Sequence, residues 1–367
     1  MRDRPTGRIG SLDGLRGVAA AVVVVHHAFL SIPTLSDGNY RRDVPDWASW
    51  MVYSPAHLVW AGSEAVFVFF VLSGFVLTLP ALRRSQDWIA YYPSRLVRLY
   101  LPVVASIALA LVFFFLVPRQ DQPHQSFWIN RHAEPFTLHG LVNDLTLLAP
   151  TLVNSPLWSL TWEVLFSLLL PLFVSIAAVT RRWWWVTAIV AVFLSALGEY
   201  EHSKWLMYLP MFLLGSALAA GWERLPDVPT LLGWVLLVVS LLGITVKWWL
   251  PTTAWWSPVL PAIILASAGT IVVLAGRWLP AERFLLGAIP RELGRLSFSL
   301  YLVHEPITVT VANLLPRALP SWLVLVAIPI GIGVAYVFSR LVELPAHRLA
   351  KHIAKSLSSR PPVPQAV

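Results

Sequence analysis

Apolar runs long enough to cross a lipid bilayer recur along the whole chain, and they constrain its fold more than any other feature. A membrane-spanning helix needs about 20 mostly apolar residues. Ten stretches are candidates: 12–30, 62–80, 99–117, 157–179, 183–199, 205–221, 230–249, 257–276, 295–314 and 321–342. Lipid offers the backbone no hydrogen-bond partner, so each stretch is expected to be helical. The sequence therefore predicts an all-α, polytopic membrane helical bundle of about ten transmembrane helices.

The composition agrees with a membrane protein and argues against a soluble enzyme. Hydrophobic residues make up 57% of the chain and charged residues 13%, against about 45–50% and 25% in soluble domains. The chain has no cysteine. Disulfides, thiolate metal sites and a thioester acyl-enzyme are therefore excluded.

The basic residues predict how the bundle is oriented. With the N-terminus inside, the inner segments hold 20 of the 27 Lys and Arg residues and the outer segments hold 7. Basic residues concentrate on the cytoplasmic side of membrane proteins, so both termini are predicted to be cytoplasmic. The same bias explains most of the net charge of +8, and no nucleic-acid partner is expected.

The chain is predicted to form one integral membrane domain over residues 1–350. Residues 351–367 are expected to be a disordered cytoplasmic tail, rich in proline from residue 360 onwards. Two long connections, 31–61 and 118–156, fall on the outer side. Loops of this length often serve as lids or binding segments, and the second one carries several histidines.

The first apolar stretch carries two polar side chains on one helical face. Arg16 and His27 are 11 residues apart, which is about 20° past three full turns, and roughly 16 Å along the axis. An ionisable group inside a membrane span is a functional hypothesis by default. The alternative is that Arg16 extends to the membrane surface and that His27 is a hydrogen-bonded core histidine.

A second basic pair lies at the start of the third stretch. Arg95 and Arg98 are three residues apart, so they share a helix face. Two guanidinium groups so placed suit a polyanion such as a nucleotide phosphate. They also fit the general excess of positive charge on the inner side, and the sequence leaves both interpretations open.

Two further stretches carry acids and other polar groups. Glu163 lies inside the outer boundary of its helix and shares a face with Ser159, so it must be paired with a cation or neutral. Tyr301, His304 and Glu305 share a face only approximately. They could form a polar network inside the membrane or a plain hydrogen-bonded contact between helices.

The familiar cofactor and metal motifs are missing. There is no phosphate loop, dinucleotide glycine fingerprint or H-E-x-x-H zinc helix, and no metal is expected. Asp43 and Asp46, two acids in the first outer loop, are only a weak indication of a metal site. The Ser73-Gly74 pair is interpreted as a site of close helix packing, with Ser73 as a nucleophile only a minor alternative. Glu343, before a proline, is interpreted as part of an ion pair at a helix end.

Six motifs occur in an order that resembles the acyltransferase 3 family of integral membrane acyl-CoA transferases. They are LDGLRGVAAAVVVVHH, FFVLSGFVL, RLVRLYLP, WSLTWEVLFSLLLP, FSLYLVHEP and VELPAHR. The resemblance covers about residues 10–350. Four features of the family are present. They are an Arg and a His separated by ten residues, a pair of arginines, the acid of a W-S-L-x-x-E run, and the Tyr and His of a Y-L-x-H run.

The resemblance implies roles for these residues. Arg95 and Arg98 would hold acyl-CoA at the cytoplasmic mouth, and Arg16 would hold the donor further in. His27 would act as general base or carry the acyl group briefly. Glu163 would orient His27 or offset its charge.

A tetrahedral oxyanion also needs hydrogen-bond donors, and we expect Tyr301 or His304 to supply one.

The resemblance further implies an acyl transfer, usually of acetyl, from cytoplasmic acyl-CoA to a hydroxyl of an extracytoplasmic acceptor such as a cell-envelope glycan. The expected location is the bacterial inner membrane, and any extracytoplasmic partner domain is expected to be a separate protein. A transporter or flippase for polysaccharide or lipid-linked intermediates is the alternative, and a scaffold subunit is a third. The acceptor, the acyl chain length, a covalent intermediate and the oligomeric state stay open.

Overall fold

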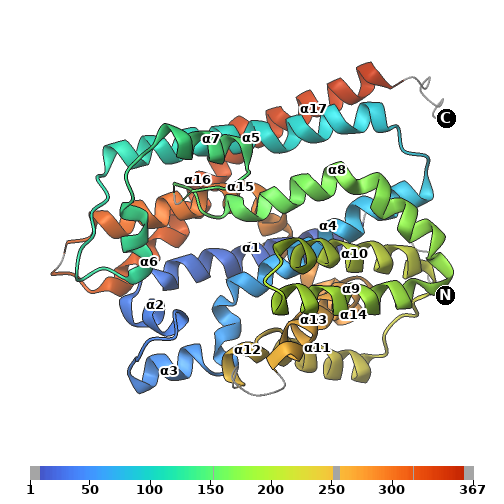
Figure 1. Ribbon diagram of the computed structural model, residues 1–367, viewed down its shortest axis with the longest axis horizontal. Helices are drawn as coiled ribbons and strands as arrows, with labels where there is room; N and C mark the ends of the chain where they lie inside the picture. The colour runs from blue at the N-terminus through green and yellow to red at the C-terminus, as the bar shows by residue number, and fades with distance from the viewer. Residues whose placement is uncertain (1–8, 152, 251–256, 317, 359–367) are drawn as a thin grey trace.

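The chain folds into a bundle of long, roughly aligned helices with shorter helices at one end (Figure 1). The computed structural model describes residues 9–151, 153–250, 257–316 and 318–358. The protein is 83% helical, and no β-strand occurs in the described segments. The predicted all-α membrane bundle is confirmed.

Each of the ten predicted stretches lies in helical structure. The long helices are α1 (Gly10–Leu30), α4 (Gly62–Arg83), α5 (Trp88–Leu116), α8 (Leu157–Val179), α9 (Trp184–Tyr200), α10 (Lys204–Gly221), α11 (Thr230–Ile244), α13 (Leu260–Arg277), α15 (Ala288–Leu314), α16 (Ala327–Phe338) and α17 (Leu344–Leu357). Within the described ranges, eight helical segments are long and apolar enough to span a membrane. Of the other two predicted spans, α11 has only 15 residues and α15, with 27, is less apolar.

The two ends of the bundle differ. Helix α1 begins and α17 ends at the same end, here called the terminal end (Figure 1). The opposite loop end carries α2 (Pro33–Asn39), α3 (Asp46–Val52) and α6 (Phe127–Asn130). This arrangement agrees with termini that share a side of the membrane. Which side that is stays a prediction.

The two long connections fold together into a cap over the loop end. Their remaining helical segments are α7 (Leu138–Thr146) and two 3₁₀ turns, Pro55–Trp60 and Arg131–Ala133. Trp60 and Trp128, one from each connection, are buried in a shared apolar cluster with Trp248 of α12 (Val246–Trp249). The backbone N–H of Trp128 donates to Ser36 Oγ at 3.2 Å. The connections are thus packed against each other rather than extended into solvent.

Small residues let the central helices approach closely. A Cβ added to Gly17 of α1 would lie 2.3 Å from the backbone nitrogen of Gly294 in α15. A Cβ on Gly74 of α4 would lie 2.1 Å from the carbonyl oxygen of Phe212 in α10. The predicted close packing at Gly74 is present. Such contacts replace the hydrophobic driving force that is missing between helices in lipid.

The end of the chain differs from the expected tail. A π-helical turn, Ser339–Glu343, joins α16 to α17, and α17 stays helical to Leu357 beside α5. Residues 351–357 are therefore helical. The rest of the expected tail, 359–367, lies outside the described residues.

Candidate active site

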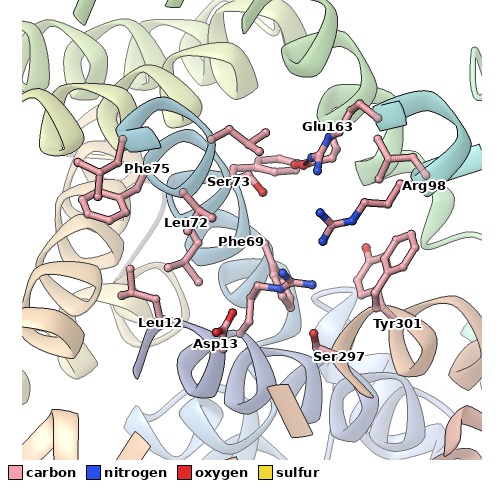
Figure 2. A pocket seen from close by; sticks show the side chains of 18 of the residues that line it. Leu12, Asp13, Phe69, Leu72, Ser73, Phe75, Arg98, Glu163, Ser297 and Tyr301 are labelled. Atoms are coloured by element: carbon pink, nitrogen blue, oxygen red, sulfur yellow. Dashed lines mark hydrogen bonds and ion pairs between the residues drawn. The ribbon is translucent and has the colours of Figure 1, made fainter. Parts of the chain in front are cut away.

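A cavity of about 580 Å³ lies between α1, α4, α5, α8, α15 and the π turn with the start of α17. Figure 2 shows that its polar side chains converge from several of these helices. It is lined by five of the residues that the sequence singles out: Arg16, Arg95, Arg98, Glu163 and Tyr301. His27 and His304 do not line it.

Arg16 is the basic residue that α1 contributes to the lining of this cavity. Its guanidinium makes no hydrogen bond and no ion pair with any residue that the structure describes. Asp13, Glu163 and Glu343 lie near enough to act on its charge. Because Arg16 lines an internal cavity, the alternative in which it extends along the lipid-facing surface does not apply. An unpaired guanidinium inside a protein is suited to an anionic ligand.

Glu163 pairs with Arg95 and not with His27. Arg95 Nη2 donates to Glu163 Oε1, and Arg95 Nε donates to Ser167 Oγ at 3.1 Å. Both charged side chains are largely buried, with 11% and 14% of their surface exposed. The sequence-based pairing of Glu163 with His27 is therefore not what the structure shows. Glu163 lies one turn further from the loop end than Ser159, next to the nearest cation on α5.

Arg98 reaches the cavity from the same face of α5. Its Nε donates to His347 Nε2 of α17 at 2.9 Å, and Figure 2 shows its side chain directed into the cavity. Arg83 and Arg84, at the end of α4, add further positive charge to the lining.

Tyr301 closes the cavity towards the loop end. Its hydroxyl lies 2.7 Å from Ser159 Oγ and donates to the carbonyl of Pro156 at 3.1 Å. Its ring contacts Phe69 edge-on at 5.9 Å, and the ring of His304 lies 5.8 Å away on the other side. Tyr301 therefore stands between the cavity and the buried histidines.

Beyond Tyr301 lies a closed cluster of three histidines and one acid. His27 Nδ1 lies 2.9 Å from His304 Nε2, and His27 Nε2 lies 3.5 Å from Glu305 Oε2. His132 Nε2, from the second long connection, lies 3.3 Å from Glu305 Oε1. Glu305, His304 and His132 are at most 1% exposed, whereas the side chain of His27 keeps 14%. We call these four residues the histidine cluster.

Backbone carbonyls fix the tautomers of this cluster. The Nδ1 atoms of His27, His132 and His304 face the carbonyl oxygens of Val23, Trp128 and Leu300 at 3.1, 2.8 and 3.0 Å. A carbonyl only accepts, so each Nδ1 carries a proton. The Nε2 atom of His27 is then the basic nitrogen, and it faces Glu305.

This tautomer also limits what His304 can do. Its one N–H donates to the backbone, and its Nε2 accepts from His27 Nδ1–H. His304 is thereby suited to orient His27 rather than to donate to an oxyanion, which leaves Tyr301 as the donor of the predicted pair.

Glu305 is the residue whose role the sequence did not assign. Its carboxylate oxygens lie 3.5 and 3.3 Å from the Nε2 atoms of His27 and His132, and they accept from the backbone N–H and the hydroxyl of Ser155, each at 2.6 Å. The sequence placed Glu305 near the face of Tyr301 and His304 but gave it no function. His132 and Ser155 were not assigned because they come from a long connection, and the histidines of that connection were the only signal.

No metal site is apparent in the described ranges, where no group of three or more His, Asp or Glu side chains is arranged to hold an ion.

Comparisons with known proteins identify the family to which the chain belongs. The chain matches the family model described as an acyltransferase domain over residues 9–340. It is 28% identical to acyltransferase MdmB of Streptomyces mycarofaciens in an alignment 333 residues long that covers 81% of this chain and 78% of that protein. Nodulation protein 10 of Rhizobium leguminosarum bv. viciae is 25% identical over 97% of this chain and 98% of its own length.

A shorter match joins the chain to a named acetyltransferase. O-acetyltransferase PaAT-1 of Phomopsis amygdali is 32% identical over 88 residues, or 21% of this chain and 15% of that protein. No solved structure matches. The family model covers most of the chain, and the chain therefore belongs to the acyltransferase 3 family and is a multi-pass membrane O-acyltransferase.

Proposed function

We propose that the enzyme takes a short acyl group, such as acetyl, from acyl-CoA bound at the terminal end and transfers it to a hydroxyl of an acceptor that enters from the loop end. One observation carries this proposal. An unpaired guanidinium in the cavity and a preorganised histidine beyond it follow one another along the axis of the bundle. The first suits an anionic donor, and the second suits acid–base chemistry on an alcohol.

The lining of the cavity supports a CoA donor. Arg83, Arg84, Arg95 and Arg98 lie on its lining with Arg16 deeper in α1. Phosphates are bound well by several arginines, because each guanidinium gives charge and directed hydrogen bonds. The phosphates of CoA would stay near the mouth, and the slender pantetheine arm would extend past Arg16 towards Tyr301.

The histidine cluster can perform the transfer step. His27 Nε2 takes the proton of the acceptor hydroxyl while the oxygen attacks the thioester carbonyl. The new C–O bond forms, the C–S bond breaks, and the thiolate of CoA receives the proton from His27. Glu305 stabilises the imidazolium that exists between these two proton transfers, and His304 fixes the orientation of the ring.

Tyr301 has to move for donor and base to meet. Its hydroxyl is bonded to Ser159 and to the Pro156 carbonyl, and its ring separates the cavity from His304. When the thioester enters, the hydroxyl would exchange these partners for the developing oxyanion and donate a hydrogen bond to it.

We place the acceptor on the loop end, where the basic nitrogen of His27 faces Glu305 and the cap. The positive-inside prediction puts this end outside the cytoplasm, so the acceptor we favour is a cell-envelope glycan and the membrane is the bacterial inner membrane. The relatives support only O-acylation itself, through names such as O-acetyltransferase.

Transfer by the purified protein in lipid nanodiscs tests the proposal, with labelled acetyl-CoA as donor and envelope glycan as acceptor. Arg16→Ala is expected to raise the KM for acetyl-CoA about tenfold to a hundredfold, because a charged hydrogen-bonding contact is lost. Arg182→Ala is the matched control, since Arg182 is exposed and lies outside the cavity. No transfer by the wild type, or an unchanged KM in Arg16→Ala, would contradict the proposal.

A further inference from the structure

We infer that α17 forms a wall of the donor site, and that His347 is a positioning residue that holds Arg98 for the phosphates of the donor. This inference rests on the proposed function, because it takes acyl-CoA as the ligand of the cavity. It gives a role to a segment that the sequence assigned to a helix end and a tail.

The position of α17 carries the first step. Helix α17 packs beside α5, and Figure 1 shows the two running together at the terminal end. Glu343, in the π turn, and His347, on α17, line the same cavity as Arg16. The cavity is therefore bounded on this side by the last described helix of the chain.

The contact between α5 and α17 carries the second step. Arg98 Nε–H donates to His347 Nε2 at 2.9 Å, so this nitrogen of His347 holds a lone pair and the ring is neutral in this contact. A neutral imidazole is a weak phosphate ligand. Its effect is to fix the plane of the Arg98 guanidinium, which Figure 2 shows directed into the cavity. A preorganised guanidinium loses less freedom when it binds a phosphate.

The π turn explains how α17 presents these residues. A π turn inserts one extra residue, which rotates the following helix by about 100° relative to an unbroken α-helix. Pro345 has no N–H and so removes one bond of the regular ladder. Buried Glu343 accepts from the hydroxyl of Ser299 on α15, which anchors the turn. Without the extra residue, His347 would face away from Arg98.

A purely structural role for His347, as a tie between two helices, predicts a different outcome from a positioning role. A structural tie would affect every substrate alike. Loss of a residue that positions a phosphate contact should raise the KM only for donors that carry phosphates. A side chain with an acceptor oxygen at the same place should restore the affinity for those donors.

The test compares acetyl-CoA with acetyl-pantetheine, which lacks the phosphates. In His347→Ala, the KM for acetyl-CoA is expected to rise about tenfold while the KM for acetyl-pantetheine stays the same. His347→Gln is expected to recover most of the affinity, because its amide oxygen can accept from Arg98 Nε. His352→Ala, an exposed position on the same helix, should behave as the wild type.

Two results would overturn the inference. One is an unchanged KM for acetyl-CoA in His347→Ala, and the other is an equal rise for both donors. If the alanine variant does not fold, His347→Leu keeps the volume without the acceptor and takes its place in the comparison. If the wild type itself transfers no acetyl from acetyl-CoA, the proposed function fails first, which separates the two claims.

Discussion

The cavity and the histidine cluster lie on one axis of the bundle but differ in how their polar groups are paired. In the cavity, Arg16 has no hydrogen-bond or ion-pair partner among the described residues, and Arg98 donates from its Nε to His347. In the cluster, Glu305 accepts from Ser155 twice and faces two histidines. The open half is arranged to receive a ligand, and the closed half is already organised for chemistry.

Tyr301 separates these two halves, and its position indicates which part of the protein has to move during the reaction. The proposed donor site and the proposed base are each already formed, yet the two are not in one compartment in this structure. Motion of one side chain and its bonds to Ser159 and Pro156 would join them. Mutations in either half should then affect different kinetic constants.

The largest effect is expected for His27→Ala in the closed half. Loss of the base should lower kcat by about 10³-fold, within the range of general acid–base catalysis, while binding of acetyl-CoA to the cavity stays unchanged. Transfer rates and calorimetric binding measure the two effects. His139→Ala, at an exposed position in the cap, controls for histidine loss. A loss of donor binding in His27→Ala would contradict the separation of donor binding, in the cavity, from catalysis, in the histidine cluster.

A smaller effect should distinguish the two acids. Glu305→Gln is expected to lower kcat about 10²-fold, because the imidazolium of His27 loses its counter-charge, whereas Glu163→Gln should act mainly on the donor KM through Arg95. A double-mutant cycle measures this: Glu305 should couple to His27 and Glu163 should not. Coupling of Glu163 with His27 in kcat would support the pairing that the sequence suggested.

The smallest effect concerns a buried histidine in the cap, outside both halves. Burial lowers the pKa of His57 from 6.5 to about 3. The negative charge of Glu64 acts in the other direction and raises this pKa, but by less than burial lowers it. The folded protein therefore keeps His57 neutral while the unfolded chain takes up a proton below pH 6.5. Stability from this group is complete above pH 6.5 and falls as the pH drops towards 3.

Between pH 7 and pH 5 this should cost about 2 kcal/mol. Thermal unfolding at several pH values measures the loss. His57→Phe should flatten this dependence, since a flat ring can replace the stack of His57 on Trp248, whose ring centroid is 3.9 Å away. An equal pH dependence in the variant would show that another group is responsible. Activity at pH 7 should not distinguish the two proteins.

The sequence predicted the helices well because the pattern that specifies a membrane span is local. A run of about 20 apolar residues is sufficient to indicate a helix in lipid, and the family motifs placed Arg16, Arg95 and Arg98 in one site. The spacing of Arg16 and His27 also gave their common face. It could not show that Tyr301, from α15, would come between them.

The partners of the acids could not be predicted for the same reason. Glu163 and Glu305 are both single acids in apolar helices, and their spacing along each helix does not say which cation will be near. The choice depends on packing between helices far apart in the chain, such as the contact of α5 with α8 that brings Arg95 to Glu163. His132 comes from a connection with no helical periodicity. His347 is part of the VELPAHR motif but lies beyond the last predicted span, and no role was predicted for it from the sequence.

One measurement tests the central claim most directly: acetyl transfer in sealed vesicles that contain the enzyme in a single orientation, with acetyl-CoA supplied to one face at a time. The account predicts transfer only when the donor is on the side of the terminal end. It also predicts loss of transfer in both Arg16→Ala and His27→Ala, with loss of donor binding in Arg16→Ala alone. Equal transfer from both faces, or transfer by His27→Ala at the wild-type rate, would contradict it.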